Sequence, residues 1–193
     1  MSQHRRTVLG LLAALPLAAG QALAQAAAPR VRIETAKGAI VLELYTDKAP
    51  ITAGNFLRYV DEGRYAGAVF YRALRLGFAP DKGLLQGGLN GREDKALPPI
   101  AHEPTSQTGI KHLDGTISMA RFDPGTAKCE FFICVGDSAY FDADPRQPGD
   151  NQGFAAFGRV VEGMDVVRAL HQLPVSATAG EEYGMKGQIL EPS

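Results

Sequence analysis

The sequence CEFFIC, residues 129–134, is the stretch from which the fold can be worked out. Its aromatic and β-branched residues favour a strand. Because side chains alternate along a strand, Glu130 and Phe132 share one face, while Phe131 and Ile133 point the other way, into a core. The stretch therefore predicts a strand with an apolar inner face and an outer face that combines a carboxylate with an aromatic ring.

The two cysteines that bracket this strand are not expected to pair. Residues in a strand advance by about 3.3 Å each, which puts Cys129 and Cys134 about 16 Å apart. A disulfide requires Cα atoms within about 7 Å, and the spacing fits neither a C-x-x-C redox motif nor a zinc site. We therefore expect two buried thiols that pack as small apolar side chains.

Further short strands are predicted on both sides of this stretch. A hairpin is expected over residues 31–45, and single strands in AVFYRALR, GLLQGG, DGTISMA, GFAAFGRVV and QILEP. Helices are expected within residues 48–65 and 161–173, the first with Pro50 in its first turn and Gly63 at its end. We predict a mainly β fold, a closed eight-stranded antiparallel barrel capped by two α-helices, because closure removes exposed strand edges.

The amino terminus has the layout of a secretory signal. It begins with basic residues, continues with an apolar run from Val8 to about Ala19, and offers small residues for cleavage near Ala24. The run is shorter than the roughly 20 apolar residues of a membrane span, so an uncleaved anchor is the less favoured alternative. Arg5-Arg6 resembles a twin-arginine signal, but the general secretory route is equally compatible.

These features predict a signal peptide over residues 1–24, a short linker over 25–30 and one domain over 31–193. The periplasm is the expected location, with no stable membrane insertion after cleavage. The predicted mature chain keeps 18 basic and 21 acidic residues, and no basic stripe suited to nucleic acid. We expect a monomer with no nucleic-acid partner.

Several kinds of catalytic site are not supported by the sequence. His102 and His112 lie ten residues apart, which is not a zinc-ligand spacing. The serines lack a nucleophile-elbow context, and we expect neither a Ser-His-Asp nor a Cys-His arrangement. GLLQGGLNG lacks the Gly-Lys-Ser/Thr of a phosphate-binding loop. An enzyme built on this chain is therefore expected to work without a metal, a cofactor or a covalent intermediate.

One group of residues remains. Arg72 lies beside aromatic residues in FYR, Gln86 lies on the strand LLQGG, and Ala120 ends the strand SMA. Together with Phe132, they would supply a guanidinium, an amide and an apolar floor on the outer face of the sheet. Such a combination suits a peptide better than a phosphate or a sugar.

In this order, the segments resemble the motifs of the cyclophilin family of peptidyl-prolyl cis-trans isomerases. VFYRALR is similar to F-H-R-x-x, GLLQGG to F-M-x-Q-G-G, GTISMAR to G-x-L-S-M-A-N, CEFFICVGD to S-Q-F-F-I-x, and GFAAFGRVVEGMDVV to H-x-V-F-G-x-V-x-x-G-M-x-V-V. The likeness runs from about Val31 to Ile189. It implies an eight-stranded barrel with two capping helices, which agrees with the pattern of strands and helices above.

The resemblance also implies a function. It makes the chain an isomerase of X-Pro bonds in exported proteins, with proline-containing peptides or unfolded exported proteins as partners. The alternative is a proline-peptide binding module with weak or no catalysis. Arg72 would be the catalytic group, and the residues implied in substrate binding are Leu84, Gln86, Ala120, Arg121, Phe122, Glu130, Phe132, Tyr140, Phe141 and Phe154.

The chain departs from the family pattern within this group. Gly83, Glu130, Arg121 and Phe154 stand where the family has phenylalanine, glutamine, asparagine and histidine. Tyr140 stands where tryptophan is frequent, and ten residues, 143–152, replace a much shorter turn. Because Glu130 shares a face with Arg72, we hypothesise that the two form a charge-assisted pair that either orients the guanidinium or competes with substrate for it.

Overall fold

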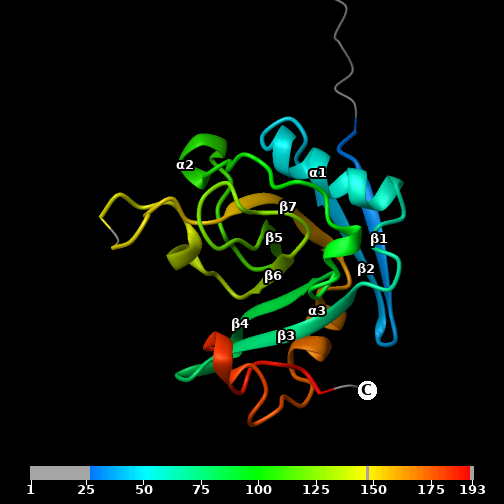
Figure 1. Ribbon diagram of the computed structural model, residues 1–193, viewed down its shortest axis with the longest axis vertical. Helices are drawn as coiled ribbons and strands as arrows, with labels where there is room; N and C mark the ends of the chain where they lie inside the picture. Colours follow the sequence, from blue (N-terminus) through cyan, green and yellow to red (C-terminus); the bar gives the residue numbers. More distant parts are fainter. Residues whose placement is uncertain (1–26, 147, 192–193) are drawn as a thin grey trace, which may run out of the picture.

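The computed structural model describes residues 27–146 and 148–191, so the predicted signal peptide lies outside the described residues. Figure 1 shows a curled sheet with a helix at either side of it. The elements in chain order are β1 (Arg30–Thr35), β2 (Gly38–Leu44), α1 (Pro50–Asp61), β3 (Val69–Leu76), β4 (Ala79–Gly88), η1 (Glu93–Lys95), α2 (Thr105–Thr108), β5 (Thr116–Met119), β6 (Phe131–Val135), η2 (Ala139–Phe141), β7 (Ala155–Glu162), α3 (Met164–His171) and η3 (Glu181–Tyr183).

The strands form one antiparallel sheet in the order β1-β2-β7-β5-β6-β4-β3. The mainly β prediction is confirmed, but the described residues form seven strands rather than eight. The expected last strand, QILEP, is reduced to isolated bridges, one of which joins Arg72 to Ile189. Gly184 and Gly187 have left-handed φ angles of 68° and 71°, so the chain turns repeatedly before residue 188 and does not extend into a strand.

The core lies on the inner face of the curled sheet. Phe56 of α1 packs against Phe131 of β6 and Phe157 of β7, with ring centroids 5.4 Å and 5.3 Å away. Ile133 is also in this cluster, whereas Phe132 and Cys134 belong to a different apolar cluster. The predicted alternation along CEFFIC is therefore confirmed, and β6 separates two apolar regions.

The helix α1 begins and ends as its sequence predicts. Pro50 occupies the first turn, and Gly63, with φ of 63°, follows the helix end. The sequence did not reveal how the first turn is capped. The buried carboxylate of Glu103 accepts hydrogen bonds from the backbone N–H groups of Ile51 and Thr52, at 3.2 Å and 2.7 Å. A negative group at a helix N-terminus is favourable, so Glu103 fixes α1 against the loop before α2.

Candidate active site

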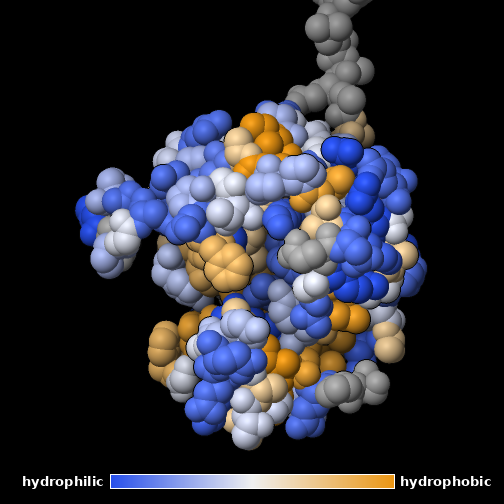
Figure 2. Space-filling model, in the orientation of Figure 1, coloured by the Kyte–Doolittle hydropathy of each residue, from blue (hydrophilic) through white to orange (hydrophobic). Residues whose placement is uncertain are grey.

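A pocket of about 620 Å³ opens on the outer face of β3, β4 and β6. Figure 2 shows a hollow near the centre of this side of the molecule. Ten predicted site residues line it, namely Arg72, Leu84, Gln86, Ala120, Arg121, Phe122, Glu130, Phe132, Phe141 and Phe154. Tyr140 is not among the lining residues. It lies on η2 with its ring 4.3 Å from that of Phe141, which does line the pocket.

The floor of the pocket is aromatic. Phe132 is only 2% exposed and lies in the middle of the group. The rings of Phe141 and Phe154 lie 5.0 Å and 5.3 Å from it, both in tilted or edge-on contact. Leu84 of β4 completes the apolar cluster. Such a floor suits a compact apolar ring, because apolar contact area is the main source of binding energy in a pocket of this kind.

Arg72 lies at the wall of this pocket and is held by neutral oxygens. Its Nη1 donates to Oε1 of Gln86 at 2.9 Å, while Nε and Nη2 both donate to Oε1 of Gln188, at 2.8 Å and 2.6 Å. Burial lowers the pKa of Arg72, but a guanidinium stays charged at neutral pH. Among the described residues, no carboxylate forms an ion pair with it. The site therefore contains an oriented cation whose charge is not neutralised.

A chain of hydrogen bonds runs from Arg72 through Gln86 to Tyr71. Because the oxygen of Gln86 accepts from Arg72, its Nε2 is the atom that donates to the hydroxyl of Tyr71, at 2.6 Å. Burial is the main cause of the raised pKa of Tyr71, and the negative charge of Glu130 adds to it. Gln86 is therefore occupied at both ends of its amide before any substrate binds. The sequence gives no signal for Tyr71 or Gln188, since neither belongs to a recognised catalytic pattern.

Glu130 lines the pocket but does not form the hypothesised pair with Arg72. Its Oε1 accepts from the backbone N–H of Asn90 at 3.0 Å, and its Oε2 is buried with no hydrogen-bond partner in the part of the chain that the structure describes. Gly88 permits this approach, since a Cβ there would lie 2.4 Å from Oε2. The hypothesis failed because strand alternation puts two side chains on one face without fixing where each side chain ends.

A second correction concerns His112, which lies behind the floor. Its Nδ1 is 2.8 Å from Oδ1 of Asp142 and its Nε2 is 2.9 Å from Oγ of Ser118, so a Ser-His-Asp arrangement does form. An ionised carboxylate only accepts, which makes Nδ1 the donor and leaves Nε2 to accept from the serine hydroxyl. Ser118 is fully buried, so it cannot meet a substrate as a nucleophile. The imidazole instead lies parallel to the ring of Phe132, 6.0 Å between centroids.

Comparisons with known proteins show the family of this chain. Residues 30–188 match the family described as cyclophilin type peptidyl-prolyl cis-trans isomerase/CLD. The chain belongs to this cyclophilin family. The match and the named relatives below identify it as a peptidyl-prolyl cis-trans isomerase.

Two curated cyclophilins illustrate the likeness. Peptidyl-prolyl cis-trans isomerase cyp18 of Streptomyces antibioticus is 36% identical over 159 residues, which cover 79% of this chain and 89% of that protein. Peptidyl-prolyl cis-trans isomerase A of Dickeya dadantii is 37% identical over 171 residues, covering 86% and 81%.

The solved structures support the fold. A cyclophilin type isomerase from Cryptosporidium parvum, crystallised in the presence of the dipeptide Ala-Pro, has a TM-score of 0.63 at 21% identity. It covers 86% of this chain and 99% of its own.

Gly83, which is predicted to stand where the family has phenylalanine, is required by the backbone of this cyclophilin. Gly83 has φ of 143°, and a Cβ there would lie 1.9 Å from the carbonyl oxygen of Leu74 on the paired strand. The pairing of β3 with β4 shifts register directly after Arg75, the partner of Gly83. No side chain fits at this position, so the backbone of the β3–β4 pair requires the glycine, although Gly83 is not among the residues that line the pocket.

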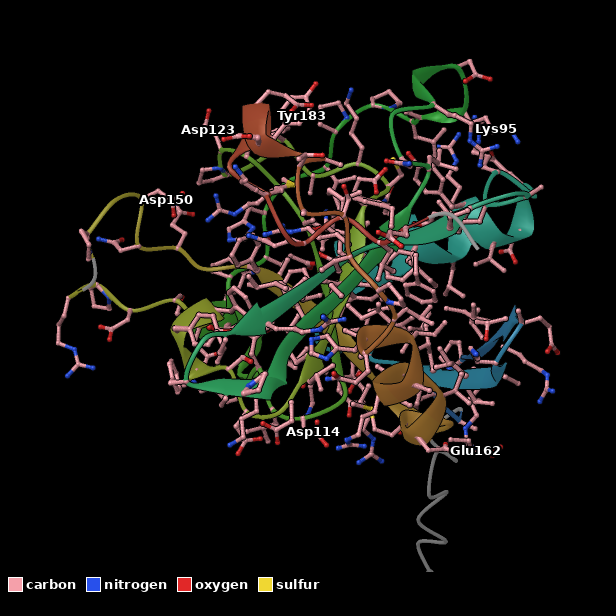
Figure 3. All side chains as sticks on the ribbon, turned by 90° about the horizontal axis from the view of Figure 1, so that it is seen from below. Lys95, Asp114, Asp123, Asp150, Glu162 and Tyr183 are labelled. Carbon is pink, nitrogen blue, oxygen red and sulfur yellow. The ribbon has the colours of Figure 1, made fainter. Side chains whose placement is uncertain are left out.

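Arg121 and Phe154, two further predicted departures from the family pattern, contact each other, and Arg121 also contacts the loop that carries Asp150. The guanidinium of Arg121 lies 5.3 Å from the ring centre of Phe154 and makes a two-pronged ion pair with Asp150, at 2.8 Å and 2.9 Å. Figure 3 shows Asp150 on the loop that stands out from the body. Arg121 also donates to the carbonyl oxygen of Gly153 at 2.9 Å. The base of the loop is thereby held against the wall of the pocket.

The other predictions concern the cysteines, metal ligands and membrane-spanning helices. Cys129 and Cys134 are not joined by a disulfide and both are buried, as expected, and burial raises the pKa of Cys134 to about 12. Within residues 27–146 and 148–191, no three His, Cys, Asp or Glu side chains gather as metal ligands would. The same part of the chain contains no helix of the length and apolarity required to cross a bilayer.

Proposed function

We propose that this cyclophilin accelerates cis-trans isomerisation of X-Pro bonds in exported proteins, with Arg72 as the catalytic group. The single observation that carries the proposal is the position of the Arg72 guanidinium, which lines a pocket floored by Phe132 and has no carboxylate partner among the described residues. A proline ring is the compact apolar group that such a floor suits.

The reaction needs no nucleophile and no proton transfer. An X-Pro bond favours trans over cis by only about 0.5–1 kcal/mol, but the two forms exchange in about 10–100 s. The barrier arises because twisting the bond removes its amide conjugation. As conjugation is lost, the proline nitrogen gains a lone pair. A cation directed at that nitrogen interacts with the twisted form more strongly than with either planar form, and this difference lowers the barrier.

Arg72 has the donors for this role. A guanidinium carries five N–H groups, and three of them are used by Gln86 and Gln188. Among the described residues, the other two N–H groups, one on each terminal nitrogen, have no hydrogen-bond partner. These groups are available to the substrate. The remaining predicted residues would hold the peptide, with Phe132, Leu84 and Phe154 against the proline and the backbone near Arg121 beside it.

The activity is tested on an Ala-Pro peptide, by a protease-coupled assay or by NMR exchange. We expect Arg72→Ala to lower kcat/KM by about 10²–10³-fold, the usual cost of removing one preorganised donor at a transition state. Arg32→Ala is the matched control, because Arg32 lies on β1, exposed and far along the sheet from the pocket. Wild-type activity no higher than that of Arg72→Ala would instead favour the proline-peptide binding module.

The exported setting rests on the amino terminus. We propose that residues 1–24 are removed as a signal peptide, that 25–30 form a linker and that 31–193 act in the periplasm on unfolded exported proteins. Strand β1 begins at Arg30, close to the proposed boundary. Fractionation of cells that produce the tagged full-length chain tests this, with amino-terminal sequencing of the product. A full-length chain in the cytoplasm would contradict it.

A further inference from the structure

The C-terminal segment runs beside the strand that carries Arg72. Ala73 donates its backbone N–H to the carbonyl oxygen of Gln188 at 2.8 Å, and Leu190 donates to that of Tyr71 at 2.9 Å. Figure 1 shows this segment, in red, next to β3 and β4. These backbone bonds on either side of Arg72 fix residue 188 opposite the catalytic strand although the segment is not a regular strand.

The side chain of Gln188 holds the guanidinium of Arg72 on one edge. A single oxygen, Oε1, accepts from both Nε and Nη2, at 2.8 Å and 2.6 Å. Two donors on one acceptor restrict rotation of the guanidinium about its last side-chain bond, which one hydrogen bond would leave free. Gln86 bonds the remaining terminal nitrogen at 2.9 Å, so the plane of the guanidinium is defined from two sides.

The acceptor is an amide and carries no charge. A carboxylate at the same place would also orient Arg72, but it would form an ion pair and lower the positive potential that the substrate nitrogen meets. A neutral acceptor orients the cation and leaves its charge available. If residue 188 only attached the C-terminal segment, a carboxylate would serve as well as an amide. A positioning role for Arg72 requires the neutral amide.

We infer that Gln188 is a positioning residue for the isomerase reaction, which fixes the direction of the Arg72 guanidinium without neutralising it. This inference rests on the proposed role of Arg72. It assigns to the C-terminal segment a part in catalysis, which no motif of the sequence indicates.

Two variants of residue 188 test the inference in the full mature chain. Gln188→Met keeps the length of the side chain and removes the acceptor, while Gln188→Glu keeps the acceptor and adds a charge. We expect both to lower kcat by roughly tenfold with little change in KM, because orientation and charge act mainly on the twisted state. Lys186→Ala, two residues earlier and exposed, is the matched control and should keep wild-type kcat.

A second measurement separates orientation from charge. The NMR signal of the Arg72 Nε–H is expected to be slow to exchange in the wild type and in Gln188→Glu, and broadened in Gln188→Met. Melting temperatures of all variants report whether the C-terminal segment stays attached. A folded Gln188→Met or Gln188→Glu variant with wild-type kcat would overturn the inference, and so would a rise in kcat, which would mean that Gln188 competes with substrate.

The same assays distinguish this inference from the proposed function. If Arg72→Ala is inactive and the residue 188 variants match the wild type, only the role of Gln188 is refuted. If Arg72→Ala retains full activity, both the catalytic role of Arg72 and the positioning role of Gln188 are refuted.

Discussion

The two faces of β6 carry similar side chains but have different roles. On the inner face, Phe131 and Ile133 pack against α1 and the other strands, and the space is filled. On the outer face, Phe132 has aromatic neighbours on two sides, but a pocket of about 620 Å³ remains above it. The difference lies in what surrounds each ring: helices and strands close the inner face, while hydrogen-bonded polar groups support and border the outer one.

The polar support of the outer face comes from both behind and beside the floor. Behind Phe132, the imidazole of His112 is tied at both nitrogens, to Asp142 and Ser118. Beside it, Arg72 is held by Gln86 and by Gln188 from the C-terminal segment. An apolar face that must stay open needs neighbours that do not collapse into it, and these hydrogen-bonded polar groups meet this need because breaking their bonds is costly.

The largest expected effect is on the inner face. Phe131→Ala removes a ring that packs among aromatic neighbours, and we expect it to lower the free energy of unfolding by about 3–5 kcal/mol. Urea denaturation followed by circular dichroism measures this loss. A loss of unfolding free energy smaller than that of a surface substitution such as Arg32→Ala would show that the inner face repacks easily. The inner face would then not differ from the outer face in how tightly it is filled.

A smaller loss of stability is expected when the attachment of α1 over the inner face is weakened. Glu103→Ala removes the carboxylate that accepts from the first turn of the helix and leaves the N–H groups of Ile51 and the buried Thr52 without this acceptor. Hydrogen bonds to charged groups are worth about 1.5–3 kcal/mol each, and we expect a loss of stability in that range. The same urea experiment applies. Activity per folded molecule should not change, since Glu103 is outside the pocket.

On the outer face, substitution is expected to affect catalysis more than stability. Phe132→Leu keeps an apolar side chain and should cost about 1–2 kcal/mol of stability, less than truncation of a buried phenylalanine to alanine. We expect kcat/KM on an Ala-Pro peptide to fall roughly tenfold, equivalent to about 1.4 kcal/mol of transition-state binding. Leu85→Ala, on the inner face of β4, is the opposite case, expected to lose stability with little change in kcat/KM. Equal losses of kcat/KM in both variants would contradict a catalytic role specific to the outer face.

The smallest effect concerns pH and the support behind the floor. Burial lowers the pKa of His112, although the neighbouring Asp142 acts in the opposite direction. The unfolded chain therefore binds a proton more readily than the folded one, and stability should fall as pH drops below 6.5, the ordinary pKa of histidine. His102 and His171 contribute in the same direction. Urea denaturation across this range should give a shallower pH dependence for His112→Gln, and an unchanged slope would exclude His112 as a contributor.

The pocket floor, the positions of most strands and the first hairpin could be predicted from the chain because their pattern is local. Alternation along CEFFIC separates Phe131 from Phe132 whatever the rest of the molecule does. The five motifs occur in the right order, and ten predicted site residues line the pocket. Pro50 and Gly63 likewise mark the ends of α1 through backbone preferences that each residue carries with it.

The connections between distant segments could not be predicted. Gln188 lies 116 residues from Arg72 along the chain, and Asp142 lies 30 residues from His112. Polar side chains find such partners only after the sheet has curled and the C-terminal segment has docked beside β3. The free direction of a long side chain also explains why Glu130 bonds Asn90 instead of Arg72.

Local patterns in the chain were thus sufficient for the mainly β fold and the apolar floor, since each depends on backbone preference and strand periodicity, while the role of Arg72 was inferred from the resemblance to the family. The direction of that guanidinium, its lack of a carboxylate partner among the described residues and the tie between Arg121 and the inserted loop depend on contacts made in three dimensions. Hydrogen bonds require specific distances and angles, and no spacing along a chain sets those in advance.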